Sequence, residues 1–335
     1  MDDGISIPSD WSPYISYSFN RIYISQASGC SANCVYCFIF DDGHPRKPRL
    51  FDIPGDDVRQ WLESQKGFRA GRNGTLISLS PYCDPFSKEV TDKTLEFVEA
   101  LAPLQNPIQL STKYFVDQTI AKRLGKSQTM FGQIILYATV TSFQFWKRIE
   151  LAADEPYLRI EGLLNARRQG INTCLAIKPV LPGITDKEID LFVKAIRDYD
   201  VPYCVVGVMY SSEKIETRIR RRKLSNDEFE LRIEIKGDRP PPCNTNRQQQ
   251  NSLNIDTLDI VYQMIPQLEA TGAQCVISGP CVVALSYDVL CPTGVWRYLP
   301  HLCVSCQANC RSKFAEVPIH MKTLFPDEVE GLKAV

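Results

Sequence analysis

Three cysteines stand close together near the start of the sequence, at Cys30, Cys34 and Cys37. Their C-x3-C-x2-C spacing puts three thiolates on one short loop, where they can bind three irons of a [4Fe–4S] cube and leave the fourth iron without a protein ligand. An open iron is a place where a substrate or cofactor can bind. A structural zinc site would need a fourth ligand nearby. The only local candidate, His44, is interpreted as a solvated surface side chain.

A second group of cysteines lies near the other end of the sequence. Cys303, Cys306 and Cys310 follow one another at C-x2-C-x3-C spacing, and Cys291 precedes them. Four thiolates from one compact segment are enough to ligate a whole [4Fe–4S] cluster or to hold zinc in a tetrahedron. The spacing does not separate iron from zinc. We favour an auxiliary [4Fe–4S] cluster over zinc, with disulfides last, and Cys281 is the rival of Cys291 for one ligand position.

The composition is that of a globular chain with many thiols. Among 335 residues there are 13 cysteines, 44% hydrophobic and 23% charged residues, which excludes a wholly disordered or collagen-like chain. A net charge of −1 means that a polyanionic partner needs a local patch. No apolar run reaches the roughly 18 residues of a membrane span, and the acidic first residues do not resemble a signal peptide. We therefore expect a cytoplasmic protein without membrane contact, in which Cys174, Cys204 and Cys275 are small buried side chains.

Short β-rich runs alternate with amphipathic helical patterns, as in parallel βα units. The predicted strands are residues 21–25, 75–80, 108–112, 133–141, 173–180 and 203–209. The predicted helices are residues 56–66, 91–101, 117–124, 156–168, 185–199 and 255–269. Thr185 and Glu188 have capping-box spacing at the start of one of these helices. Six such units predict either a doubly wound sheet or an incomplete (β/α) barrel, and periodicity does not choose between them.

Two segments interrupt the alternation. Residues 211–252 are polar and irregular, with a basic run at 218–223, and predict an insertion or a long loop. Residues 279–311 are rich in cysteine and proline and predict a small cap whose order depends on a bound centre. The predicted division is thus a barrel over residues 15–275, which carries the insertion, and a cysteine-rich cap over residues 276–335.

The first cysteine group, with the aromatic Tyr36 before its third cysteine, resembles the signature of the radical S-adenosylmethionine (SAM) superfamily. Motifs at predicted strand ends narrow the resemblance to the spore photoproduct lyase-like group: residues 80–88 (SPYCDPFSK), 111–113 (STK), 140–142 (VTS) and 177–186 (IKPVLPGITD). The resemblance covers roughly residues 18–210 and implies a partial (β/α)6 TIM-type barrel, here with a C-terminal cysteine-rich extension. The second cysteine group departs from the photoproduct lyase pattern, which argues against repair of DNA photoproducts.

This resemblance implies a particular cofactor chemistry. The amino and carboxylate groups of SAM chelate the open iron, and one electron cleaves the sulfonium to methionine and a 5′-deoxyadenosyl radical, which takes hydrogen from a substrate. The resemblance places Tyr36 near the adenine and Lys113 at the methionine carboxylate. It places Asp84 near the methionine amino group, although Asp84 before Pro85 is also typical of a turn.

Four further polar side chains are candidates for holding SAM. The guanidinium of Arg159 suits a second contact to the carboxylate. The hydroxyl groups of Ser80, Thr141 and Ser142 suit the amino group or the ribose. The alternative for Ser80 and Thr141 is an ordinary role in satisfying backbone groups at strand ends. No residue is assigned as catalytic.

The implied reaction needs partners from outside the chain: a one-electron reductant such as a flavodoxin or ferredoxin, and a small-molecule or peptide substrate. The alternative substrate is a nucleic acid, because the cations at 218–223 suit phosphates. The nearby Glu213 and Glu216 instead favour a charged, solvated helix face. A third interpretation is a non-enzymatic protein that uses both cysteine groups as zinc sites.

Overall fold

A computed structural model describes residues 4–18, 20–222, 253–254, 257–292 and 307–310. Its centre is an eight-stranded sheet in the order β1-β2-β5-β6-β7-β8-β9-β12. The six predicted strands are confirmed as β2 (Arg21–Ile24), β5 (Leu76–Leu79), β6 (Ile108–Thr112), β7 (Ile134–Thr139), β8 (Asn172–Ile177) and β9 (Tyr203–Val206). They are parallel, so their carboxyl ends lie at one edge of the sheet.

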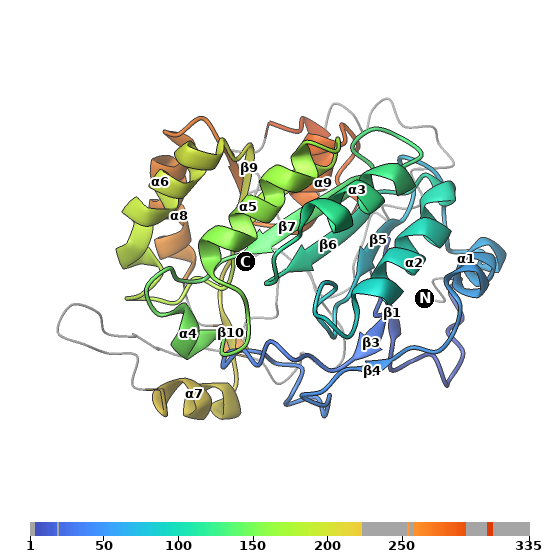
Figure 1. Cartoon of the computed structure of the whole chain (residues 1–335), viewed down its shortest axis with the longest axis horizontal. Coiled ribbons are helices and arrows are strands. Elements are labelled where there is room, and N and C mark those ends of the chain that lie inside the picture. Colours follow the sequence, from blue (N-terminus) through green and yellow to red (C-terminus); the bar gives the residue numbers. More distant parts are fainter. Residues whose placement is uncertain (1–3, 19, 223–252, 255–256, 293–306, 311–335) are drawn as a thin grey trace, which may run out of the picture.

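Two more strands extend this sheet. The parallel strand β12 (Gln274–Val276) pairs with β9, and β1 (Ile15–Ser18) pairs antiparallel with β2 at the opposite edge. Over the described residues the two edge strands do not meet, so the sheet curves without closing (Figure 1). The partial barrel is therefore confirmed.

Helices follow the strands and cover the outer face of the sheet (Figure 1). The predicted helices are confirmed as α1 (Gly55–Ser64), α2 (Thr91–Leu101), α3 (Gln118–Ser127), α5 (Pro156–Arg167), α6 (Ile189–Tyr199) and α8 (Leu258–Glu269). Two 3-10 turns, η1 (Ala102–Leu104) and η2 (Asp186–Glu188), adjoin α2 and α6. Local signals explain the starts: the Asp117 side chain accepts from the Ile120 amide at the start of α3, and Pro156 begins α5.

The inner face is closed at the amino ends of the strands. Helix α9 (Gly279–Ser286) packs there in an apolar cluster with Leu76 and Ile135, and the Tyr137 hydroxyl donates to the Gly279 carbonyl at 2.8 Å. Cys174, Cys204 and Cys275 are buried in β8, β9 and β12, as predicted. The open side of the barrel is consequently the edge formed by the carboxyl ends of the strands.

Short elements surround that edge. The pair β3 (Ala27–Ser28) and β4 (Arg49–Leu50), the pair β10 (Tyr210–Ser211) and β11 (Leu253–Asn254), and helices α4 (Trp146–Ile149) and α7 (Glu213–Arg220) lie along it (Figure 1). Helix α7 shows that the predicted irregular insertion begins with a regular element, because Ile215 and Ile219 supply it with a buried apolar side.

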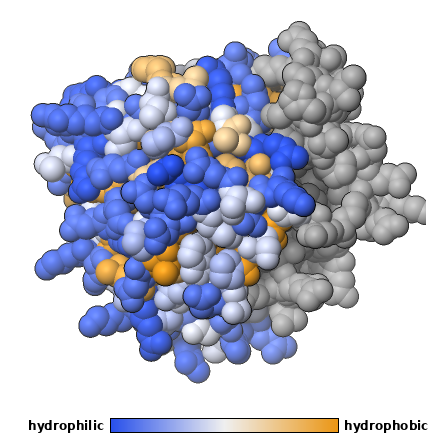
Figure 2. Space-filling view, turned by 90° about the vertical axis from the view of Figure 1, so that its right-hand side faces the viewer, coloured by the Kyte–Doolittle hydropathy of each residue, from blue (hydrophilic) through white to orange (hydrophobic). Residues whose placement is uncertain are grey.

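The surface on the side that carries α1 is mostly hydrophilic, with apolar side chains showing in small patches (Figure 2). Among the described residues, no helix has the length and apolar character needed to cross a bilayer.

Candidate functional site: the cysteine loop and a buried carboxylate

The loop that carries Cys30, Cys34 and Cys37 lies at the carboxyl ends of the strands. Cys34 forms an isolated antiparallel bridge with Glu150, which follows β7. Beside it, the Val35 amide donates to the Ile149 carbonyl at 2.9 Å. The loop thus has backbone contacts to the segment after the sheet's central strands, where barrel folds collect their ligand-binding groups.

Gly29 sets the entry into this loop. Its φ is +102°, and a β-carbon there would lie 2.3 Å from the Pro45 carbonyl oxygen, so only glycine fits. Its amide donates to the Tyr82 carbonyl at 3.0 Å, which ties the loop to the segment after β5.

Cys34 is buried, and Cys30 and Cys37 are partly exposed. Burial is the largest cause that raises the pKa of Cys30, Cys34 and Cys37 above the ordinary thiol value, and Lys113 acts in the opposite direction at Cys34 and Cys37. Binding of a metal must therefore release protons from these thiols. In the part of the chain that the structure describes, no three His, Cys, Asp or Glu side chains are arranged to hold one metal ion. The thiols of a cube bind different irons, so they need not converge on one ion.

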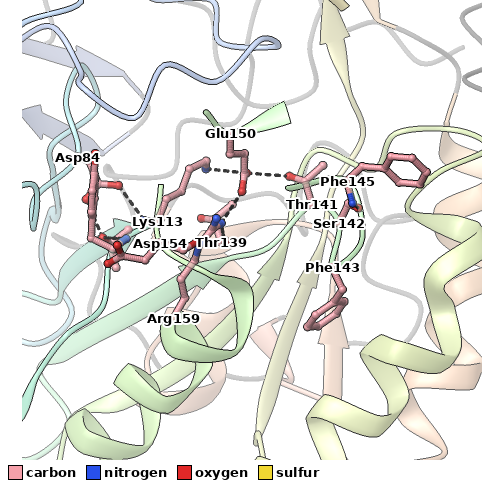
Figure 3. A network of polar contacts seen from close by, with 12 residues as sticks. Asp84, Lys113, Thr139, Thr141, Ser142, Phe143, Phe145, Glu150, Asp154 and Arg159 are labelled. Atoms are coloured by element: carbon pink, nitrogen blue, oxygen red, sulfur yellow. Dashed lines mark hydrogen bonds and ion pairs between the residues drawn. The ribbon is translucent and has the colours of Figure 1, made fainter. Parts of the chain in front are cut away.

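A buried carboxylate, Glu150, joins most of the predicted cofactor residues (Figure 3). Its Oε1 accepts from the Tyr36 hydroxyl and from Thr141 Oγ1 at 3.3 Å, and lies 3.9 Å from Lys113 Nζ. Its Oε2 accepts from Arg159 Nη1 at 2.5 Å. Burial acts to raise the pKa of Glu150, but the cations of Arg159 and Lys113 outweigh it and the pKa lies below its usual value. Glu150 is therefore an anion between two cations, beside the cysteine loop.

Lys113 links this carboxylate to the predicted adenine residue. Its Nζ lies 5.7 Å from the centre of the Tyr36 ring, within the range of a cation–π contact. Asp84 fixes the backbone at Lys113. Its carboxylate accepts hydrogen bonds from the Lys113 amide at 2.7 Å and from Thr112 Oγ1 at 2.6 Å. Asp84 also accepts from the Phe86 amide at 3.1 Å, as the turn interpretation predicts.

Arg159 is buried, and its guanidinium has three described acceptors: Glu150, the Thr139 carbonyl at 2.8 Å and the Asp154 carbonyl at 2.7 Å. Its Nη2 has no hydrogen-bond partner among the described residues. The Nη2 group of Arg159 is thus a buried donor that can bind one further acceptor.

The predicted hydroxyl ligands already have protein partners. Ser80, which has a φ of +63°, donates to Gln26 Oε1. Ser142 donates to Glu188 Oε1 at 2.6 Å. The Ser80 bond reaches a side chain and not a backbone group, whereas Ser142 Oγ also accepts from the Phe145 amide at 2.8 Å. Thr141 instead belongs to the network around Glu150 and Tyr36.

Two local expectations were wrong. Thr185 and Glu188 do not form a capping box, because the Thr185 hydroxyl donates to the Thr141 carbonyl at 2.8 Å and Glu188 accepts from the Phe143 amide at 2.6 Å. His44 is not a solvated surface side chain. It is partly buried, stacks on Tyr82 at 4.6 Å between ring centres, and its Nδ1 lies 2.8 Å from Ser28 Oγ.

The second cysteine group is described only in part. Cys291 and Cys310 are buried in the inner apolar cluster, which also contains Cys281. Cys303 and Cys306 lie outside the described residues. The ligand set of this group therefore stays a prediction.

Sequence patterns missed Glu150 and the pair formed by Arg218 and Asp41, and they gave Glu188 a different role. The partners of Glu150, Arg218 and Asp41 lie on other segments of the chain, and none of the three pairs through a motif of fixed spacing. The weak signal for Glu150 is its position between Ile149 and Leu151, since an acidic residue in an apolar setting needs a partner when it is buried.

Comparison with known proteins gives this geometry a context. No protein-family model matches the chain. A curated relative from Pseudomonas phage M6, described as a radical SAM Nalpha-GlyT isomerase, is 25% identical over 175 residues. That match covers 50% of the chain and 35% of the relative, so it spans about a third of the relative's length.

Solved structures show the same fold. Spore photoproduct lyase complexed with dinucleoside spore photoproduct has a TM-score of 0.56 at 12% identity, over 75% of this chain and 74% of that one. A radical S-adenosylmethionine methyltransferase from Kitasatospora setae, with tryptophan and a SAM analogue bound, has a TM-score of 0.53 at 10% identity, over 88% of this chain and 62% of that one. The chain is thus similar in sequence, over half of its length, to a protein described as a radical SAM isomerase, and similar in fold to spore photoproduct lyase and to a radical SAM methyltransferase. At these identities the solved structures show the fold alone, so the roles of individual residues in this chain stay predictions.

Proposed function

We propose that the chain is a radical SAM enzyme that holds a [4Fe–4S] cluster through Cys30, Cys34 and Cys37 and cleaves SAM reductively. The observation that carries the proposal is the position of these three thiols on one loop, with Cys34 buried and Cys30 and Cys37 partly exposed, beside the cations of Lys113 and Arg159. When bound, such a cluster supplies the electron that splits SAM into methionine and a 5′-deoxyadenosyl radical, which takes a hydrogen atom from a substrate. The electron comes from an external reductant such as a flavodoxin or ferredoxin.

The donor set suits both groups. Three thiols give the cluster three ligands and leave one iron for SAM. In this proposal Lys113 and the unpartnered Nη2 of Arg159 face the methionine carboxylate, and the ring of Tyr36 lies near the adenine. Glu150 holds Lys113, Tyr36 and Arg159 around one point, so it acts as a positioning residue.

The remaining predicted contacts have different support. Thr141 lies in the network of Glu150 and is proposed to face the amino group or ribose. Asp84 is proposed to act through the backbone of Lys113, while Ser80 and Ser142 would have to exchange their present partners to reach SAM.

Formation of 5′-deoxyadenosine tests the proposal. The full chain, reconstituted with iron and sulfide under anaerobic conditions, is incubated with SAM and dithionite, and nucleoside and methionine are measured by liquid chromatography. We expect equal amounts of both products, and none from a Cys30→Ala, Cys34→Ala, Cys37→Ala variant. Iron bound by the three thiols without any cleavage of SAM would overturn the proposal. A colourless protein that binds zinc would support the non-enzymatic interpretation.

We further propose that Cys291, Cys303, Cys306 and Cys310 hold an auxiliary [4Fe–4S] cluster in a cap over residues 276–335. The buried positions of Cys291 and Cys310 support it, because thiols in one apolar cluster can ligate a solvent-shielded centre. About eight irons per chain, falling to about four when these four cysteines are replaced by alanine, are expected. About four irons in both proteins would refute the auxiliary cluster.

A small molecule or peptide is the proposed substrate, and one observation favours a nucleic acid as the second candidate. Exposed cations flank the cysteine loop on two sides. One set lies near β4 (Arg46, Lys47 and Arg49), and the other lies on α4 and at the end of α7 (Lys147, Arg148 and 220–222). Arg46 donates to Asn33 in the loop, and Arg148 Nη2 donates to the Arg222 carbonyl at 2.5 Å. This local patch on a nearly neutral chain suits phosphates.

Binding of fluorescent oligonucleotides at increasing salt separates the two candidates. A nucleic-acid substrate predicts an association constant that falls steeply with salt, and a shallower slope in an Arg46→Gln, Lys47→Gln, Arg49→Gln variant. The matched control is Arg123→Gln, which removes an exposed cation paired with Glu99 away from the loop. Weak binding with no change of slope favours a small-molecule or peptide substrate.

A further inference from the structure

Arg218 contacts the cysteine loop from a helix far along the chain. Its Nε donates to the Val35 carbonyl at 2.9 Å, and its Nη2 donates to the Cys37 carbonyl at 2.8 Å. The same guanidinium pairs with Asp41 just beyond the loop, with Nη2 lying 3.3 Å from Oδ2. One side chain thus holds both ends of the turn that presents Cys37.

Helix α7 gives Arg218 a fixed position. The Ser212 hydroxyl caps the helix by accepting from the Ile215 amide at 3.2 Å, and it donates to Asp41 Oδ2 at 2.8 Å. Ile215 and Ile219 are buried in one cluster with Val35. Arg218 is itself only 20% exposed, so the prediction of a solvated helix face does not hold for this residue.

The charge of Arg218 has a consequence for a cluster on this loop. One-electron reduction makes a cluster more negative, so a cation near its ligands favours the reduced form. Asp41 acts in the opposite direction, because an anion at the same place disfavours the added electron. The two members of the pair are therefore expected to shift the potential with opposite signs.

We propose that Arg218 is a positioning residue that holds the turn between Cys34 and Cys37 and raises the reduction potential of the cluster bound there. This inference rests on the proposed function, since it concerns the cluster that the three thiols hold. Its role is distinct from that of Lys113 and Arg159, because Arg218 contacts the ligand loop rather than the network of Glu150.

The test is a redox titration of the reconstituted full chain, followed by electron paramagnetic resonance of the signal that changes on addition of SAM. In Arg218→Met the ratio of reduced to oxidised cluster at a fixed potential should fall about tenfold, which corresponds to about 59 mV for one electron. Arg218→Lys should fall between this variant and the wild type, because it keeps the charge without the two-armed contact. Asp41→Asn should shift the ratio upward. The matched control is Arg220→Met, since Arg220 lies on the same helix with a side chain 67% exposed.

The outcomes separate this inference from the proposed function. Equal potentials in Arg218→Met, Asp41→Asn and the wild type would overturn the inference and leave the proposed function intact. A shift of the same sign in both variants would also overturn it, because only a general structural disturbance gives that result. Absence of a cluster from Arg218→Met, with full iron in Arg220→Met, supports the positioning role, and Asp41→Asn then tests the charge. A wild type without any cluster refutes the proposed function first.

Discussion

The first cysteine group and Cys291 of the second group lie at opposite ends of the sheet. Cys34 pairs with Glu150 beyond the carboxyl end of β7, whereas Pro292, next to Cys291, accepts a hydrogen bond at 3.3 Å from Asn20, which precedes β2. A strand as long as β6, with its five residues, spans about 16 Å. The first group and Cys291 are thus separated by about the length of a strand, so they cannot share a ligand directly.

Their surroundings differ as much as their positions. The first group lies beside Lys113, Glu150 and Arg218, whose charges and hydrogen bonds can act on an ionic cofactor. Cys291 and Cys310 lie among apolar side chains that fill the inner face of the sheet. The difference teaches that the spacing of thiols alone does not distinguish the two groups. They differ in the charged side chains that the fold brings to one end of the barrel and not to the other.

The largest expected effect concerns the thiols themselves. Cys34→Ala should reduce 5′-deoxyadenosine formation below detection, since the cluster loses one of three ligands. Cys291→Ala should retain SAM cleavage within a few fold, because its thiol lies at the other end of the sheet. Both proteins are compared for iron content and circular dichroism. Loss of SAM cleavage in a folded Cys291→Ala protein would contradict the proposed difference between Cys291 and the first cysteine group.

The next effect is on stability at the polar end. Glu150→Gln leaves the buried Arg159 without its anion, and we expect the free energy of unfolding to fall by about 3–5 kcal/mol. Glu99→Gln is the control: Glu99 forms an exposed pair with Arg123, and its loss should cost at most about 1 kcal/mol. Urea unfolding measures both. Equal losses would show that Glu150 has no special role.

A smaller effect depends on pH. Burial raises the pKa of Glu188, so the folded chain takes up this proton at a higher pH than the unfolded chain. The stability linked to Glu188 is therefore greatest below the ordinary carboxyl pKa and is lost as the pH rises through the raised value. Relative to Glu188→Gln, the wild type should lose stability as the pH rises above the ordinary carboxyl pKa. If the unfolding free energies of the two proteins change with pH in parallel, the raised pKa of Glu188 is contradicted.

The smallest expected effect concerns a buried cysteine that belongs to neither group. Cys174 is fully buried in β8, with Sγ 3.5 Å from the Leu175 carbonyl. Cys174→Ala should cost about 1 kcal/mol and leave iron and SAM cleavage unchanged. Urea unfolding and iron analysis check this result. A loss of iron would mean that this thiol is a ligand.

Sequence patterns predicted the parallel strands because strands buried on both faces have a simple apolar signal, as in β7. They also predicted the cysteine loop, whose ligands are close along the chain. Glu150 and Arg218 could not be predicted, since their partners are set by tertiary packing. Thr185 and Glu188 had the spacing of a helix cap, but the end of β7 offered them buried partners instead.

The central claim is that the three thiols of the first loop hold a cube whose open iron binds SAM. Electron–nuclear double resonance of the reduced protein with SAM labelled with ¹⁵N at the methionine amino group tests it most directly. The account predicts a hyperfine coupling from that nitrogen, absent from the variant with alanine at Cys30, Cys34 and Cys37. A reduced cluster on this loop that shows no such coupling in the presence of SAM would contradict it.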